Sequence, residues 1–228
     1  MALDNLSFQV NQGETVGVIG PNGAGKTTLF DLITGFQRPT SGVVLFDGRE
    51  ITGQSPDQIV QKGMNRTFQI VRPFKDLTVL ENVLVGLILG KGKLTRKRGR
   101  EELKSQAMEL LQLVGLTRAP LSLSRNLSHG ELKKLELARA LSTYPDVLLV
   151  DEVFSGLSAQ ETQELSDALV RVKANRNLTL LMVEHKVSKV VQLANRMLVL
   201  DHGKLLSQGT PQEILSDQKV LEAYLGRG

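Results

Sequence analysis

The chain has 228 residues, of which 41% are hydrophobic and 23% are charged, and it carries a formal net charge of +4. This size and composition predict one soluble domain, or one domain with lobes, that buries a sizeable core. The sequence has no cysteine, which excludes disulfides and cysteine nucleophiles, and no apolar run approaches the roughly 18 residues of a transmembrane helix.

The first predicted element is a strand at residues 6–10, where apolar and polar side chains alternate in LSFQV. Such alternation is typical of a half-buried strand. The following Asn11-Gln12-Gly13 predicts a turn into the next strand.

A glycine-rich loop follows the apolar run VGVI at residues 16–19, and an amphipathic helix is predicted from Lys26 onward. The loop matches G-x-x-x-x-G-K-[ST], in which backbone N–H groups at a helix N-terminus converge on phosphate oxygens. In this pattern Lys26 reaches the β- and γ-phosphates and the Thr27 hydroxyl is a ligand for Mg²⁺. The candidate nucleotide-binding residues are Gly20, Pro21, Asn22, Gly23, Ala24, Gly25, Lys26, Thr27 and Thr28.

Short elements precede a long helical stretch. Strands are expected at residues 42–46 and 49–51 around the turn Asp47-Gly48, followed by a helix at 55–62 and an extended segment at 63–69. From residue 77 to about residue 116 the apolar residues form two helical faces. The basic stretch between these faces, KGKLTRKRGR at residues 91–100, is more typical of a solvated linker than of a binding patch.

The last third alternates strands and helices. Ser128 and Glu131 form a predicted capping box before the helix at 132–142, which by itself indicates only a helix start. The remaining expected elements are strands at 147–150, 178–183 and 197–200, a helix at 159–172, a hairpin turn at 201–204, and helices that begin at Pro211 and Gln218. This alternation predicts a mostly parallel α/β sheet.

Polar groups follow three of the apolar strands, at 20–27, at Asp151-Glu152 and at Glu184-His185. Because ligands gather at the carboxyl ends of parallel strands, we expect these groups to be neighbours. Asp151 is then placed to hold Mg²⁺ and Glu152 to orient or deprotonate a water. His185 at the same edge could contact the γ-phosphate, although a lone histidine at a strand end is more often structural. His202 lies in a turn and is interpreted as structural.

Together these motifs resemble the ATP-binding subunit of an ABC transporter over nearly the whole chain. The resemblance rests on GPNGAGKTT at 20–28, a Q-loop glutamine at Gln69, the signature LSHGE at 127–131, VLLVDE at 147–152, a D-loop at 155–158 and the switch histidine His185. Within that family the chain is most similar to ATPases of branched-chain amino acid importers, through NRTFQIVRPFKDLTVLENVLVG, LITGFQRPTSG and the ending GTPQEIL…VLEAYLG. ATPases for urea or other amides and for lipopolysaccharide export share much of the pattern.

The resemblance implies a fold and a division of the chain. The fold is a P-loop NTPase (RecA-like) α/β domain, with a mostly parallel core, an N-terminal antiparallel β subdomain and an inserted α-helical subdomain. Residues 1–228 would form one ABC ATPase domain, in which 1–75 and 143–228 make the core and 76–142 make the helical signature subdomain.

The resemblance also implies the site and the partners. Glu152, with Lys26, Gln69 and His185, would hydrolyse ATP, and Thr27, Gln69 and Asp151 would hold Mg²⁺. Ser128 and Gly130 would meet the nucleotide of a second cassette, either another copy or a paralogue, paired head to tail. Permease subunits would dock near residues 68–89, which places the protein in the cytoplasm on the inner face of the membrane, with no specific nucleic acid partner.

Several positions depart from the family pattern. Family members usually begin with a further strand and an aromatic residue that stacks on adenine, whereas this chain starts at Met1-Ala2-Leu3-Asp4. Absence of that stacking would weaken binding by about 1–3 kcal/mol. His129, Glu131, Val153 and Ser158 also replace more usual residues.

Three functions other than that of a transport ATPase have to be considered for this sequence. Two stay open: a non-transport ABC-type regulator, and an N-terminally truncated domain with impaired nucleotide binding. A small GTPase or P-loop kinase is excluded, because the sequence has no D-x-x-G or N-K-x-D guanine motif and a signature helix would have no purpose there.

Overall fold

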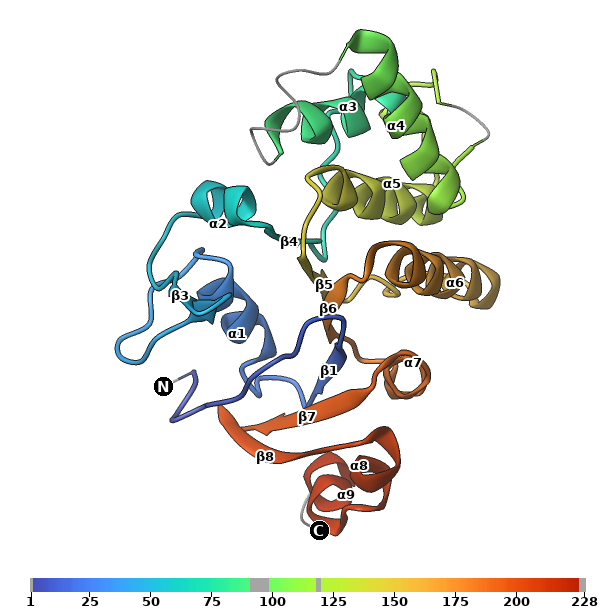
Figure 1. Cartoon of the computed structure of the whole chain (residues 1–228). Coiled ribbons are helices and arrows are strands. Elements are labelled where there is room, and N and C mark those ends of the chain that lie inside the picture. Colours follow the sequence, from blue (N-terminus) through green and yellow to red (C-terminus); the bar gives the residue numbers. More distant parts are fainter. Residues whose placement is uncertain (1, 91–98, 118–119, 226–228) are drawn as a thin grey trace.

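The computed structural model describes residues 2–90, 99–117 and 120–225 (Figure 1). A sheet in the order β4-β5-β6-β1-β7-β8 forms its centre, and every pairing is parallel except that of β7 with β8. The strands are β1 (Thr15–Ile19), β4 (Met64–Arg66), β5 (Val147–Asp151), β6 (Thr179–Val183), β7 (Arg196–Asp201) and β8 (Lys204–Gly209). The parallel core that the sequence predicts is confirmed.

Helices cover both faces of this sheet. In Figure 1, α1 and α2 lie on one side of the strands, α6 and α7 lie on the other, and α3 and α4 lie at the far end beyond α5. The helices are α1 (Lys26–Ile33), α2 (Pro56–Lys62), α3 (Val79–Leu89), α4 (Arg100–Leu113), α5 (His129–Ser142), α6 (Ala159–Arg176), α7 (Val187–Leu193), α8 (Pro211–Ser216) and α9 (Gln218–Leu225), with a 3₁₀ turn at Ser124–Asn126.

Two predicted turns are confirmed by their backbone angles. Asp47 and Gly48 join β2 (Leu45–Phe46) to β3 (Arg49–Glu50), and His202 and Gly203 join β7 to β8. All four residues have positive φ, between 45° and 78°. This is the geometry of a tight two-residue hairpin turn, which explains why each pair ends in glycine.

Two strand predictions near the N-terminus are wrong, one entirely and the other in extent. Residues 6–10 form no strand, although Leu6, Phe8 and Val10 are half-buried against the core, so their alternation reflects contact with the core rather than pairing. The strand expected at 42–46 is limited to Leu45–Phe46. Conversely, the segment expected to be merely extended at 63–69 contains β4, which pairs with β5 at the sheet edge.

Most of the basic stretch that we interpreted as a solvated linker lies outside the described residues, which omit 91–98. Among the described residues, no helix combines the length and the apolarity that a membrane crossing requires.

Three apolar clusters hold the helices to the sheet. One joins α3, α4, α5 and α6 to β5 and β6, one joins α1 to the opposite face, and one joins α7, α8 and α9 to β1 and β7. Full burial of one Leu, Ile or Phe stabilises the fold by about 1.5–3 kcal/mol. The clusters therefore fix the strand ends, where the candidate site lies.

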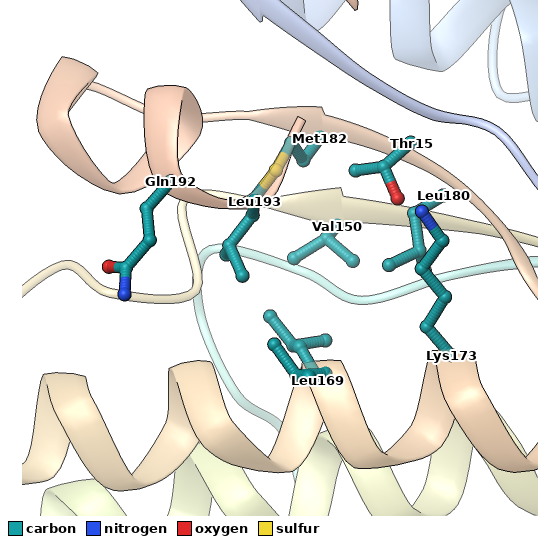
Figure 2. A pocket seen from close by; sticks show the side chains of 9 residues that line it. Thr15, Val150, Leu169, Lys173, Leu180, Met182, Gln192 and Leu193 are labelled. Carbon is teal, nitrogen blue, oxygen red and sulfur yellow. The ribbon is translucent and has the colours of Figure 1, made fainter. Parts of the chain in front are cut away.

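A cavity of about 200 Å³ interrupts this packing between α6, α7 and the sheet (Figure 2). Its apolar walls include Val150, Leu169, Leu180, Met182 and Leu193. Thr15 of β1 also lines it, and the Thr15 Oγ1 atom is buried without a hydrogen-bond partner among the described residues. An unpaired buried hydroxyl destabilises a fold. Thr15 and the cavity beside it therefore lower the stability of this part of the core.

Candidate active site

The glycine-rich loop connects β1 to α1 at the carboxyl edge of the sheet. All five residues of β1 are buried, and the strand ends at Ile19. At Gly20, where φ is +154°, an added Cβ would lie 2.1 Å from the Leu200 carbonyl oxygen. Gly25, with φ of +102°, immediately precedes the first helical residue, Lys26. The strand, loop and helix that the motif requires are therefore present.

The Lys26 side chain lies inside this loop. Its Nζ atom donates to the carbonyl oxygens of Gly20 at 2.8 Å and Pro21 at 3.0 Å. Burial lowers the pKa of Lys26 below its ordinary value, and the negative charges of Glu152 and Asp151 oppose this effect. The ammonium group is thus held by the loop and is acted on by the charges of the two carboxylates at the end of β5.

Asp151, the last residue of β5, is paired with a buried arginine. Arg66 of β4 donates from Nη2 to Asp151 Oδ2 at 2.6 Å and from Nη1 to Asp31 Oδ1 at 2.5 Å. The Arg66 guanidinium also lies over the rings of Phe68 at 5.2 Å and Phe30 at 5.5 Å. Burial raises the pKa of Asp151, and the hydrogen bond from Arg66 acts in the opposite direction.

Glu152 lies between two side chains from other segments. Gln69 Nε2 donates to Glu152 Oε2 at 2.7 Å, and His185 Nε2 lies 2.8 Å from Glu152 Oε1. Glu152 itself has φ of +47°, a left-handed conformation that costs a non-glycine residue about 1–2 kcal/mol. Its backbone N–H donates to Val183 O at 2.9 Å, which attaches the strained turn to β6. The strand ends bring Glu152 and His185 together as expected, and Gln69, which only the family resemblance assigned to the site, reaches Glu152 from the segment after β4.

Ser128 and Gly130 belong to a different part of the structure. Ser128 is the N-cap of α5, and the predicted capping box with Glu131 is confirmed. A Cβ at Gly130 would lie 2.3 Å from Glu161 Oε1, so α5 and α6 approach closely there. Within the described residues no hydrogen bond joins Ser128 or Gly130 to the phosphate loop.

Sequence reasoning assigned no role to several buried charged residues near this site. Apart from Arg66, these are Lys133 and Glu136 of α5, which are 1% and 6% exposed. Glu184 was noted only as a strand-end residue; its Oε1 accepts a hydrogen bond from Phe154 N at 3.0 Å. Burial raises the pKa of Glu136 and of Glu184 to about 7. The available signal was charged residues within an apolar helix face, at Lys133 and Glu136 beside Leu135 and Leu137.

The donor chemistry of the site suits a nucleotide with Mg²⁺. The Thr27 hydroxyl, the Asp151 carboxylate and the Gln69 amide oxygen are hard oxygen donors of the kind that Mg²⁺ prefers alongside water and phosphate. Among the described residues no group of three His, Cys, Asp or Glu side chains is placed to hold a metal by itself.

Comparison with known families gives two matches. The ABC transporter family matches residues 3–155, and a branched-chain amino acid ATP-binding cassette transporter family matches residues 204–228.

Curated relatives match over nearly the whole chain. The high-affinity branched-chain amino acid transport ATP-binding protein LivG of Escherichia coli K12 is 37% identical over 99% of this chain and 92% of its own length. BraF of Pseudomonas aeruginosa, with the same description, is 36% identical over the same shares.

Solved structures agree with these matches. The ADP conformation of MJ1267, an ATP-binding cassette of an ABC transporter, superposes with a TM-score of 0.87 at 33% identity, covering 99% of this chain and 93% of that one. A dimeric post-hydrolysis state of the cassette MJ0796, bound to ADP and Pi, gives 0.82 at 26% identity, over 92% and 90%. The chain therefore belongs to the ABC transporter family, as an ATP-binding and ATP-hydrolysing cassette.

Proposed function

We propose that this cassette powers the import of branched-chain amino acids or related small solutes. The observation that carries its motor role is the position of Glu152, which lies between Gln69 and His185 and whose charge acts on Lys26 of the phosphate loop. The substrate class is taken from the names of relatives such as LivG and BraF, which match nearly the full length of this chain.

Residues 20–28 bind the phosphates of ATP in this proposal. Their N–H groups lie at the start of α1, where the helix dipole favours negative charge. Lys26 exchanges its bonds to Gly20 O and Pro21 O for bonds to the β- and γ-phosphates. Thr27, Asp151 and Gln69 would hold Mg²⁺, which neutralises phosphate charge when bound.

Glu152 is the general base for hydrolysis. It accepts a proton from the water that attacks the γ-phosphorus, while the bond from that phosphorus to the ADP oxygen breaks. Gln69 donates to one carboxylate oxygen of Glu152, and His185 Nε2 contacts the other. In this proposal His185 turns from Glu152 to donate to a γ-phosphate oxygen once ATP is bound. The proton then passes to the released phosphate, which restores Glu152.

A second cassette completes the site. Ser128 and Gly130, at the start of α5, contact the γ-phosphate that the partner's loop holds, and the partner is another copy or a paralogue. The dimeric structure of MJ0796 supports such pairing, with a TM-score of 0.83 at 26% identity, over 92% of this chain and 90% of that one.

The start of the helical subdomain, residues 76–142, and the segment just before it carry the contact with the permease. The docking region at residues 68–89 exposes large apolar side chains, namely Phe68, Ile70, Phe74, Ile88 and Leu89, which are between 42% and 69% exposed. Exposed large apolar side chains of this kind are what a partner surface would cover. Docking there would hold the protein on the inner face of the cell membrane.

Uptake of radiolabelled leucine tests the transport function. A strain of the source organism that lacks this chain should lose high-affinity uptake, and the unsubstituted gene should restore it. A Glu152→Gln gene should not restore it, whereas the matched surface change Asp167→Asn on α6 should. Full uptake with Glu152→Gln, or uptake that is unaffected by loss of the chain, would refute the proposal.

A further inference from the structure

Helix α5 holds the segment that carries Gln69 through three charged side chains. Lys133 Nζ donates to Gln69 O at 2.8 Å, and Glu136 Oε1 accepts from Phe68 N at 2.6 Å. One turn further on, Arg139 Nη1 donates to Arg72 O at 2.9 Å. Residues three apart in a helix lie on neighbouring turns of one face, so a single face of α5 makes all three contacts.

Two of these contacts fix the backbone on both sides of Gln69. The Phe68 N–H precedes the Gln69 Cα and the Gln69 carbonyl follows it, so the orientation of the intervening chain is set by Glu136 and Lys133. The Gln69 side chain then donates to Glu152. A continuous series of contacts therefore runs from α5 through Gln69 to Glu152.

These charged residues are placed at a cost to stability. Lys133 is 1% exposed and Glu136 is 6% exposed, and Glu136 Oε2 has no partner among the described residues. The charge of Lys133 acts on Glu136 and on Glu184, both of which are buried. Apolar residues of similar volume would pack a helix at least as well. The arrangement is thus better explained by the geometry that it imposes than by stability.

We propose that Lys133 and Glu136 are positioning residues that hold Gln69 against Glu152 and so connect the start of α5 to the hydrolytic carboxylate of the same chain. The inference rests on the proposed function, in which Ser128 and Gly130 at that start meet the nucleotide of the second cassette. A shift of α5 on engaging that nucleotide would move Phe68 and Gln69 and change the contact with Glu152. The two nucleotide sites are coupled by this route.

A double-mutant cycle for ATP hydrolysis by the full chain tests the proposal. Glu136→Leu removes the acceptor for Phe68 N–H and should lower kcat about tenfold, with KM for ATP within about twofold, because the phosphate loop is untouched. Glu136→Gln keeps an acceptor oxygen and should retain about half of kcat or more. In a Gln69→Ala background, Glu136→Leu should change kcat by less than about twofold, because the group through which it acts is gone.

Lys133→Met supplies a second, independent variant, with the neighbouring Lys134→Met as its matched control. Lys134 pairs with Glu164 at 2.6 Å. Lys133→Met should show the same loss and the same dependence on Gln69, and Lys134→Met should stay within about twofold of the unsubstituted chain. Equal losses in the presence and absence of Gln69 would mean ordinary structural damage and would overturn the proposal.

Amide hydrogen exchange without nucleotide gives a readout that does not need activity. Peptides that cover residues 66–75 should exchange at least about tenfold faster in Glu136→Leu and Lys133→Met, while peptides that cover 15–30 stay unchanged. Unchanged exchange at 66–75 would overturn the inference. Absence of Glu152-dependent hydrolysis in the unsubstituted chain would instead refute the proposed function, and the exchange result would still decide whether α5 holds this segment.

Discussion

Replacement of Arg66 by methionine should destabilise the protein severely. The Arg66 and Asp151 side chains are only 6% and 5% exposed, so their pairing is poorly screened by solvent. Removal of one partner leaves a buried carboxylate uncompensated, which costs about 3–5 kcal/mol. Loss of the contacts with the Phe30 and Phe68 rings adds about 0.5–1 kcal/mol each. We therefore expect a loss of about 4–7 kcal/mol in the free energy of unfolding.

Urea unfolding at pH 7 measures this loss, and two further variants show its origin. Arg66→Met combined with Asp151→Asn should recover at least about half of the loss, because the uncompensated charge is gone. Arg66→Lys should lose less stability than Arg66→Met but should not match the unsubstituted chain. A lysine keeps the positive charge but lacks the planar fork that makes both ion pairs. If Arg66→Met loses less than about 1 kcal/mol, or if Asp151→Asn gives no recovery, the reasoning about this buried pair is refuted.

The remaining predictions concern the cavity, the phosphate loop and pH. Thr15→Val removes the unpaired hydroxyl and should raise stability by about 1 kcal/mol and Tm by about 2–4 °C, as measured by calorimetry; a lower Tm would show that Thr15 has a partner. Gly20→Ala places a Cβ 2.1 Å from Leu200 O, which displaces the phosphate loop and should lower the rate of ADP formation about a hundredfold, whereas Gly99→Ala, with open space around it, should not. Burial raises the pKa of Glu184 from 4.5 to about 7, so the folded state keeps a proton that the unfolded state releases, and stability should fall as pH rises from about 4.5 to about 7. Glu184→Gln should reduce that slope in urea unfolding, and an unchanged slope would contradict the assignment.

The sequence predicted the parts of this site that local patterns determine. The phosphate loop follows from a motif whose strand, glycines and helix are contiguous, and Asp151 and Glu152 follow an unmistakably apolar run. Because parallel strands share one carboxyl edge, Glu152 and His185 could be expected as neighbours, and they lie 2.8 Å apart. The catalytic roles of these residues stay predictions.

Features that depend on distant pairing could not be predicted. Arg66 faces Asp151 only because β4 pairs with β5 across more than 80 residues of sequence, and a three-residue strand gives little periodic signal. The sequence around Lys133 and Glu136 could show that these charges lie among apolar helix residues, but their partners become evident only when the segment at Phe68 is placed against α5. The opposite error occurs at residues 6–10, where alternating burial arises without any strand partner.

The rate of ADP formation by purified Glu152→Gln protein tests the central claim most directly. Glutamine keeps the size of the side chain and can still bond to Gln69 and His185 but cannot accept the proton from water. We predict that the rate falls by about a hundredfold or more, while ATP affinity stays within about threefold of that of the unsubstituted chain. Hydrolysis at the unsubstituted rate would contradict the claim that Glu152 is the base and would place the proton acceptor elsewhere in the site.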